Sequence, residues 1–459
     1  MRTCLLNIVR RNDYVSIPIM KWIKSDNYRS FAQLLVSSEN WSPDQVYDWQ
    51  LNHVKAIVDY AYVHVPAYRQ KFKEAGYLPG DIKSWSDFEK LPFLSKDEIK
   101  NNFSDFVSDE KIPSHKAFTS GSTGKPMQFM HDCATSDREK AMFHYYWAKY
   151  GYRYGDKCIV LRGQGIADLP KKRFYQYDRF QNYKQFDSSL ISNPEYLEYY
   201  DKGIRQFHAQ IMQAYPSAVF SLAKNYINSG IDAPKFHTIF LGSENVTPYQ
   251  CSFIKKVFHA EHVMYHYGLS ECTGLALKHP EEDKLCFIPV YGYTEIVNNG
   301  TVCHDVGENG EIVTTGFNKS TPFIRYKTGD FTSISETKKE SFLRNCKVVE
   351  LIEGRKQDYV VTKNKRLIPV VWICGQHIKT LDKLSDFQYE QSEIGKLIVK
   401  VVIQPGSGSE ESIVSDVQKE LSHLLEDVDV VIKIVDDITK NPRGKRISMI
   451  QKLDTESFR

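Results

Sequence analysis

The segment Thr119–Pro126 has the residue types that a polyphosphate-binding loop needs. It reads TSGSTGKP, so its first seven residues include four hydroxyl side chains, two glycines and a lysine. Glycine lets the backbone approach phosphate oxygens, hydroxyl and amide groups donate hydrogen bonds, and lysine adds positive charge. The segment therefore predicts a phosphate loop, although its composition alone also fits a flexible Gly/Ser loop.

Two better-known motifs do not match this loop. A Walker A loop needs glycine five residues before Gly124 and Ser or Thr after the lysine, where this chain has Thr119 and Pro126. A nucleophile elbow of the G-x-S-x-G type would need glycine at 118 or 120. Neither position is glycine, so the loop is not expected to hold an activated serine.

Two further patterns resemble known binding motifs in part. The stretch 162–168 begins as a dinucleotide fingerprint, but Asp168 stands where the third glycine belongs, which favours a surface turn. Four residues with zinc-binding side chains also lie within 21 residues, at a spacing that matches no standard finger. Cys272 fits a buried thiol equally well, so no metal is assigned to the set His266, Cys272, His279 and Cys286.

Composition limits the function classes. The chain has 459 residues and a formal net charge of +3 from 60 Lys+Arg and 57 Asp+Glu, so a general nucleic-acid binder is disfavoured. An aromatic content of 13% argues against a disordered scaffold, and the length predicts two or three folding units. Nine scattered cysteines without a C-x-x-C pair indicate reduced thiols and a cytoplasmic protein. The basic, partly apolar N-terminus is too short for a secretory signal, and no stretch is long enough for a transmembrane helix.

The first 290 residues predict an α/β body. Apolar spacing predicts a helix over 44–61 that ends before Pro66, and Ser84 and Ser95 are expected N-caps. Alternating β-rich and helical runs then predict mostly parallel strands. The expected strands are 158–161, 218–220, 238–241 and 262–265, and the expected helices are 194–214 and 248–259.

Beyond residue 286 the pattern changes to shorter strands with Gly and Asn turns. Asn299-Gly300 predicts a hairpin, and an antiparallel sheet or small barrel is expected there. A compact α+β segment follows, with strands expected at 358–362, 396–404 and 428–435 and helices at 371–383 and 410–425. The predicted fold class is therefore a large N-terminal α/β body with parallel sheets and a small β-barrel-like part, followed by a small α+β C-terminal domain.

Six motifs in order resemble one family. They are TSGSTGKP at 119–126, GSE at 242–244, YGLSE at 267–271, RYKTGD at 325–330, EGRKQDY at 353–359 and NPRGK at 441–445. This order is similar to that of the adenylate-forming superfamily, which includes acyl-CoA synthetases and peptide-synthetase adenylation domains. The stretch 59–102 resembles the branch with phenylacetate:CoA ligases, deazaflavin-coenzyme adenylyltransferases and capsule-biosynthesis homologues. The resemblance extends over about residues 45–450.

The resemblance implies an ATP and Mg²⁺ site. In the family the phosphate loop holds the β- and γ-phosphates, the glutamate of YGLSE ligates Mg²⁺, the tyrosine stacks on adenine and the aspartate of RYKTGD binds the ribose. The lysine of NPRGK bridges the carboxylate and the α-phosphate. The implied catalytic residues are Lys445, Glu271 (also the metal ligand) and Lys125, and the implied nucleotide-binding residues are Thr119, Ser120, Gly121, Ser122, Thr123, Gly124, Ser243, Glu244, Tyr267, Gly268, Ser270, Asp330 and Arg355.

The family's C-terminal domain swings about a hinge after the Gly-Arg pair, which implies a boundary between residues 1–353 and 354–459 with the pivot at 356–358. Gln357 stands where many relatives have Asp, and Arg366 lies where some relatives use an arginine on phosphate or CoA. A second departure is the order of His279 and Cys286, which is reversed relative to capsule-type relatives.

The helix around residues 144–147 occupies a region that lines the acyl pocket in relatives, so His144, Tyr145 and Trp147 are candidate substrate-pocket residues. Trp and Tyr at helical spacing also fit ordinary packing.

The expected function is activation of a carboxylate as an acyl-adenylate and transfer of the acyl group to CoA, another thiol or an amine. CoA would be a further ligand in the first case. The alternatives are an adenylyltransferase acting on a coenzyme or sugar intermediate, and a non-catalytic member in polysaccharide biosynthesis. The expected partners are a small carboxylate and a CoA, amine or sugar acceptor, and a homodimer is compatible with the sequence.

Overall fold

The computed structural model divides the chain into two compact units. Unit 1 comprises Met1–Asp156, His266–Thr328 and Thr332–Leu351, and unit 2 comprises Lys157–Tyr265, Gly329–Phe331 and Ile352–Arg459. The structure describes residues 25–119, 126–162, 165–179, 181–244, 246, 248–336, 345–352, 354–355, 359–370, 373, 380, 383–404, 407–439 and 447–458.

Unit 1 begins with helices whose ends the sequence specifies. Helix α4 (Pro43–His64) starts with Ser42 as N-cap and Pro43 in the first turn, and it ends at the residue before the Val65-Pro66 pair. Ser95 caps α7 in the same way, with its hydroxyl accepting from the Glu98 N–H. The expected helix over 44–61 and the expected N-caps Ser84 and Ser95 are confirmed. The other helices of unit 1 are α3 (Asp26–Ser38), α5 (Pro66–Glu74), α6 (Trp85–Phe88), α7 (Lys96–Asn101), η1 (Phe103–Phe106) and α8 (Cys133–Ala148).

Two antiparallel sheets complete unit 1. One has the order β12-β11-β13-β14, and its hairpin turns at Asn299 and Gly300, both with positive φ, as the sequence predicts. The other has the order β15-β10-β9-β8, and a separate two-stranded hairpin joins β1 and β2. The strands, of which β8 and β14 belong only in part to unit 1, are β1 (Ser114–Phe118), β2 (Gln128–Asp132), β8 (His262–Gly268), β9 (Leu275–Lys278), β10 (Leu285–Phe287), β11 (Tyr293–Asn298), β12 (Thr301–Val302), β13 (Asn309–Thr315), β14 (Tyr326–Ser333) and β15 (Lys347–Val349).

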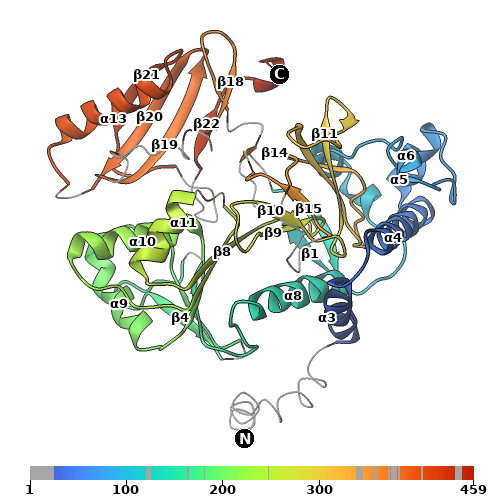
Figure 1. Cartoon of the computed structure of the whole chain (residues 1–459), viewed down its shortest axis with the longest axis horizontal. Coiled ribbons are helices and arrows are strands. Elements are labelled where there is room, and N and C mark those ends of the chain that lie inside the picture. Colours follow the sequence, from blue (N-terminus) through green and yellow to red (C-terminus); the bar gives the residue numbers. More distant parts are fainter. Residues whose placement is uncertain are drawn as a thin grey trace, which may run out of the picture. The chain divides into compact units, whose positions relative to one another are not determined.

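The body of unit 2 is built on a largely parallel sheet. β5, β3, β6 and β7 are consecutive parallel neighbours, whereas β4 joins the edge antiparallel to β5. Helices α10 and α11 lie side by side next to this sheet (Figure 1). The elements are β3 (Cys158–Leu161), β4 (Tyr175–Asp178), β5 (Tyr183–Phe186), η2 (Pro194–Tyr196), α9 (Leu197–Arg205), β6 (Ile211–Ala214), α10 (Pro216–Ser229), β7 (Thr238–Gly242) and α11 (Pro248–Val257).

One expected strand of this body is wrong. Residues 218–220 lie inside α10, and the strand of this region is β6, which occupies the end of the helix expected over 194–214. The buried residues of α10 include Ala218, Val219, Leu222, Ala223 and Tyr226, which is the spacing of one helix face. Pro216 in the first turn starts that helix, so a strand assigned from three apolar residues overlooked the longer period.

The C-terminal part of unit 2 is a four-stranded sheet, order β21-β20-β19-β22, with α13 packed along it (Figure 1). The expected strands at 358–362, 396–404 and 428–435 and the helix at 410–425 are confirmed, whereas the helix at 371–383 lies largely outside the described residues. The elements are β16 (Gly354–Arg355), β17 (Tyr359–Val361), β18 (Leu367–Pro369), β19 (Leu384–Glu393), β20 (Lys396–Ile403), α13 (Glu410–Leu424), β21 (Asp429–Ile434), β22 (Met449–Gln451) and η4 (Thr455–Phe458).

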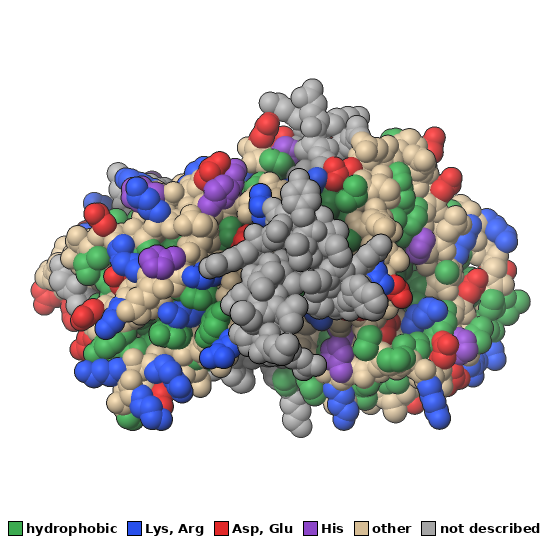
Figure 2. Space-filling model, turned by 90° about the horizontal axis from the view of Figure 1, so that it is seen from below, with side chains coloured by type: hydrophobic (Ala, Val, Ile, Leu, Met, Phe, Trp, Pro, Cys, Tyr) green, Lys and Arg blue, Asp and Glu red, His purple; other side chains and the backbone are tan. Residues whose placement is uncertain are grey.

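The surface agrees with the small net charge. On the face drawn in Figure 2, Lys and Arg side chains lie among Asp and Glu side chains, and neither sign forms a large patch over the described residues there. Among the described residues, no helix combines the length and the apolar character that crossing a membrane requires.

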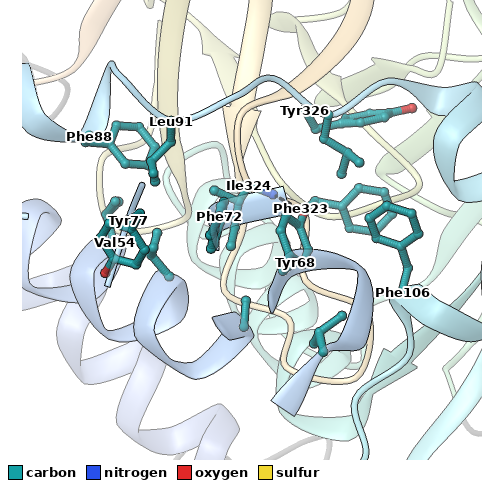
Figure 3. Close-up of a cluster of buried hydrophobic side chains, with 14 of the residues drawn as sticks. Val54, Tyr68, Phe72, Tyr77, Phe88, Leu91, Phe106, Phe323, Ile324 and Tyr326 are labelled. Carbon is teal, nitrogen blue, oxygen red and sulfur yellow. Dashed lines mark hydrogen bonds between the residues drawn. The ribbon is translucent and has the colours of Figure 1, made fainter. Parts of the chain in front are cut away.

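An apolar cluster joins the N-terminal helices of unit 1 to the segment before β14. Tyr68 and Phe72 of α5 and Phe106 pack with Phe323 and Tyr326, as Figure 3 shows. The Tyr68 hydroxyl donates to the Pro322 carbonyl at 3.1 Å. The helices and this segment therefore form one core, although about 220 residues of chain separate them.

The buried ion pair Arg325–Glu295 lies beside this cluster. The Arg325 guanidinium is 3.2 and 2.8 Å from the two Glu295 carboxylate oxygens, and both side chains are almost fully buried. Arg325 also donates to the carbonyls of Glu89 and Leu91, and its guanidinium lies 4.1 Å from the centre of the Phe93 ring. Strand β11, which carries Glu295, is thereby tied to the segment after α6.

We expect Glu295→Gln to destabilise the chain by about 3–5 kcal/mol, because the substitution leaves the Arg325 charge buried without a counter-ion. Urea unfolding followed by tryptophan fluorescence measures this change. Asp429→Asn is the control, since it removes the exposed 2.6 Å pair with Lys363 and should cost about 0–1 kcal/mol. Equal effects of the two substitutions would show that the buried pair does not determine stability.

Candidate active site

The YGLSE motif lies where β8 ends. Tyr267 and Gly268 are the last two residues of β8, and Ser270 and Glu271 follow in a tight turn. Cys272 closes this turn, because its N–H donates to the Leu269 carbonyl and its φ is +53°. Glu271 is buried, with 5% of its surface exposed, whereas Ser270 is exposed. The half-buried Tyr267 ring packs edge-on against Phe287 at 5.9 Å.

A hydroxyl from β14 holds the Glu271 carboxylate. The Tyr326 hydroxyl donates to Glu271 Oε1 at 2.8 Å, and both side chains are buried. The structure thus brings together two motifs, YGLSE and RYKTGD, that are more than 50 residues apart in the chain. The sequence analysis gave Tyr326 no role, although its position in RYKTGD was a signal that could have identified it.

The phosphate loop is the connection of the β1–β2 hairpin. Thr119 and Met127 close it through two 3.0 Å hydrogen bonds, one between their backbones and one from the Met127 N–H to the Thr119 hydroxyl. Thr119 itself is buried, and these bonds fix the first residue of the loop. The remaining predicted loop ligands, Ser120, Gly121, Ser122, Thr123, Gly124 and Lys125, lie outside the described residues.

The predicted adenine-pocket residues of unit 2 follow β7. Ser243 has a φ of +69°, and its hydroxyl accepts a 2.6 Å hydrogen bond from Arg162, whose guanidinium lies over the Tyr215 ring. Glu244 accepts a 3.0 Å hydrogen bond from the Ser217 N–H through Oε2. Its other oxygen, Oε1, is buried and has no hydrogen-bond partner in the part of the chain that the structure describes.

Asp330 and Arg355 lie opposite each other in unit 2. They form a cross-strand pair between β14 and β16. Asp330 is buried, and Gly329 before it has a φ of +78°, a conformation that favours glycine. Lys445 and the expected pivot at 356–358 lie outside the described residues.

Two of the candidate substrate-pocket residues on α8 contact helix α3. The Tyr28 hydroxyl and His144 Nδ1 are 3.0 Å apart, and the Tyr145 hydroxyl donates to Glu39 at 2.5 Å. Trp147 is buried and contacts Phe143, one helical turn before it. Phe143 in turn packs against His266, the neighbour of Tyr267, with ring centres 4.7 Å apart. The sequence analysis missed Phe143, and its i, i+4 spacing from Trp147 was the available signal.

His131 on β2 is a second residue that the sequence analysis missed. It is 6% exposed, it faces the backbone of Glu271, and its Nε2 atom has no hydrogen-bond partner among the described residues. Burial lowers its pKa, so the ring is neutral at physiological pH. No spacing signal marked His131, because its position is set by the β1–β2 hairpin.

The four candidate metal ligands do not form a metal site. Within the described ranges, no group of three or more His, Cys, Asp or Glu side chains could hold a metal ion. The His279 ring is 2% exposed, and its Nδ1 accepts hydrogen bonds from the N–H groups of Glu281 and Glu282. Burial raises the pKa values of the Cys272 and Cys286 thiols, which favours the neutral form over the thiolate that binds metals.

Comparisons with known proteins agree with the motifs. The chain is 24% identical to protein CapK of Staphylococcus aureus over 377 residues, which are 80% of this chain and 81% of that protein. It is 27% identical to phenylacetate-coenzyme A ligase of Escherichia coli (strain K12) over 72% of this chain and 76% of that protein. No family model matches the chain.

The fold agrees as well. A crystal structure of 2-hydroxyisobutyryl-CoA ligase in complex with 2-HIB-AMP aligns with a TM-score of 0.66 over 89% of each chain, at 18% identity. The chain is therefore similar in sequence to phenylacetate-coenzyme A ligases and to protein CapK, and similar in fold to an acyl-CoA ligase. The similarity to phenylacetate-coenzyme A ligases agrees with the branch that the stretch 59–102 predicted.

The Cys272 thiol next to Glu271 is expected to be chemically inert, because it is buried and its pKa is raised mainly by that burial. Treatment of the native protein with iodoacetamide at pH 7.5, followed by peptide mass mapping, should modify the exposed Cys133 and leave Cys272 intact. Both should react after unfolding. Modification of Cys272 at the rate of Cys133 would contradict this description of the turn.

Proposed function

We propose that this chain activates a carboxylate with ATP and Mg²⁺ as an acyl-adenylate, releases pyrophosphate, and then passes the acyl group to CoA. The observation that carries the proposal is the buried Glu271, held by Tyr326 in the turn after β8. A carboxylate fixed in this way is a suitable oxygen ligand for a divalent cation. The sequence similarity to phenylacetate-coenzyme A ligases over 72–80% of the chain supports the same reaction.

The side chains of unit 1 fit the metal that the family uses. Mg²⁺ prefers hard oxygen ligands and usually combines one or two carboxylates with phosphate oxygens and water. Glu271 provides such a carboxylate, and the cation would neutralise charge on the phosphate oxygens. Ser270, exposed in the same turn, is proposed to contact the α-phosphate, and the loop from Thr119 to Lys125 is proposed to hold the β- and γ-phosphates.

The residues proposed for the nucleoside come from YGLSE, from RYKTGD and from the segment after β7. We propose that Tyr267 stacks on adenine, that Asp330 accepts hydrogen bonds from the ribose hydroxyls, and that Arg355 assists from the opposite strand. Glu244 Oε1 is a buried acceptor whose lost hydration would be compensated by an N–H donor such as the adenine amino group. Gly268 and Ser243 would line the same nucleotide.

The lysine and the domain boundary are part of the proposal. Residues 354–459 would form the C-terminal domain that moves relative to 1–353, with the pivot at 356–358, and would deliver Lys445 to the carboxylate and the α-phosphate. A lysine is a compact point charge, which suits a transition state whose charge develops on phosphate oxygens.

The acceptor is proposed to be CoA, in keeping with the names of the phenylacetate-coenzyme A ligase relatives. A further structure of 2-hydroxyisobutyryl-CoA ligase, which contains 2-HIB-AMP and CoA, aligns with a TM-score of 0.52.

The acid is proposed to lie near α8, where Trp147 and Phe143 share one face of the helix. His144 and Tyr145, which hydrogen-bond to Tyr28 and Glu39, are proposed to hold this helix in place. A cytoplasmic location is proposed because all seven described cysteines are free thiols.

The proposal predicts that purified protein exchanges labelled pyrophosphate into ATP when a panel of small aromatic and hydroxy acids and Mg²⁺ are present. Glu271→Gln should lower this exchange by about 10²-fold or more, because an uncharged amide is a poor Mg²⁺ ligand. Mass spectra of products with and without CoA would separate a thioester from AMP transfer to another acceptor. The absence of exchange with every acid, together with the absence of ATP binding, would refute the proposal.

Lys445→Ala should reduce the adenylation rate by about 10²–10³-fold, because it removes a charge that acts on the developing transition state. ATP affinity should stay close to that of the wild type, since the nucleotide is held by other residues. Lys433→Ala, at an exposed position on β21, is the matched control and should leave both quantities unchanged. If Lys445→Ala adenylates as fast as Lys433→Ala, Lys445 is not part of the mechanism.

A further inference from the structure

We propose that Tyr326 is a positioning residue for Glu271: its hydroxyl fixes the carboxylate that receives the nucleotide-bound Mg²⁺. The inference rests on the proposed function and adds a residue to it that the motif comparison had not assigned. Tyr326 does not contact the nucleotide in this proposal; it acts through Glu271.

The first observation is the direct contact. The Tyr326 hydroxyl lies 2.8 Å from Glu271 Oε1, and the two residues are 2% and 5% exposed. Figure 3 shows that the phenol ring belongs to the apolar cluster, whereas its hydroxyl points away from the labelled apolar side chains. The ring is therefore held by packing, including an edge contact with Phe323 at 5.1 Å, while the hydroxyl is directed to the carboxylate.

The second observation is that the backbone of Tyr326 is fixed on both sides. Leu94 forms a parallel bridge to it, with the Leu94 N–H donating to the Arg325 carbonyl and the Lys327 N–H donating to the Leu94 carbonyl, both at 2.9 Å. The Arg325 side chain adds its bonds to Glu295 and to two backbone carbonyls. The backbone that carries the hydroxyl is therefore rigid, as a positioning group requires.

The hydrogen bond from Tyr326 prepares the Glu271 carboxylate for a cation. A glutamate side chain has three rotatable bonds, so fixing it before the cation arrives removes an entropy cost from binding. A phenol that donates to the charged form also favours the ionised carboxylate, which is the form that ligates a cation. Carboxylates that bind metals are commonly hydrogen-bonded in this way, and loss of such a partner typically costs about 10–100-fold in metal affinity or activity.

A purely structural role of Tyr326 makes a different prediction. If its hydroxyl only satisfied a buried carboxylate, its removal would lower stability without changing how the protein uses the cation. Tyr68 offers a matched comparison, because it is a buried tyrosine in the same cluster. Its hydroxyl donates to the Pro322 carbonyl at 3.1 Å and accepts from the Ile324 N–H at 2.9 Å.

The test compares Tyr326→Phe with Tyr68→Phe in the full chain. We expect Tyr326→Phe to raise the Mg²⁺ concentration for half-maximal pyrophosphate exchange by about 10-fold, with Tyr68→Phe close to wild type. A readout independent of turnover is the binding of Mn²⁺ to the protein–ATP complex, followed by the loss of its free electron-spin-resonance signal. Its apparent Kd should rise by a similar factor in Tyr326→Phe only.

Glu271→Gln supplies the second arm. Because Tyr326 is proposed to act through Glu271, Tyr326→Phe should cause no further loss of Mn²⁺ binding in the Glu271→Gln background. Unchanged Mn²⁺ affinity in Tyr326→Phe, or equal losses in Tyr326→Phe and Tyr68→Phe, would overturn the inference while leaving the proposed function intact. A wild-type chain that neither exchanges pyrophosphate nor binds Mn²⁺–ATP would overturn both.

Discussion

The buried guanidinium of Arg325 is the constraint on which the organisation of unit 1 depends. Charge at this depth is tolerated only when its donors are paired, because an unpaired buried cation costs several kcal/mol. Arg325 meets this condition with the Glu295 carboxylate and with carbonyls of the segment after α6. The N-terminal helical region, β11 and the start of β14 must therefore assemble together, since none of them can satisfy the charge alone.

Glu271 is held as a consequence of this assembly. Tyr326 follows Arg325 directly, so the backbone held by Leu94 and by the Arg325 ion pair leads into a ring that the apolar cluster holds. Burial itself works against a charged side chain at this site. Desolvation disfavours the charged form of a carboxylate, and it raises the pKa of nearby phenols and thiols, Cys272 among them. The hydrogen bond from Tyr326 offsets part of that cost for Glu271. The buried Glu271 carboxylate thus has a hydrogen-bond donor in an interior that favours neutral groups.

Much of the fold could be predicted from the sequence where a local pattern is strong. The cap at Ser95 and the Asn299-Gly300 hairpin follow from side chains that act on their own backbone. Strand β19 was not predicted, because its sequence LSDFQYEQSE is polar. Two of its glutamines are fully buried, and Gln388 donates to the carbonyls of Thr439 and Ile447. Partners so distant in the chain leave no local signal.

In the candidate site, too, the sequence marked some residues and missed those placed by contacts distant in the chain. Motif order identified Glu271, Tyr267 and Asp330 as residues to examine, but it could not show that His144 and Tyr145 hydrogen-bond to groups on α3 or near its end. It also left Phe143 and His131 unmarked, since both are placed by contacts between elements far apart in the sequence.

RYKTGD illustrates why a motif is more than a set of ligand contacts. Arg325 pairs with Glu295, Tyr326 holds Glu271, and Asp330 lies opposite Arg355, so one short stretch has three different roles. Gly329, within the same strand, has a positive φ that glycine adopts without strain. A substitution at the first two positions would therefore act on Glu271, the proposed Mg²⁺ ligand, from the interior of the protein, although neither side chain is assigned a contact with the nucleotide.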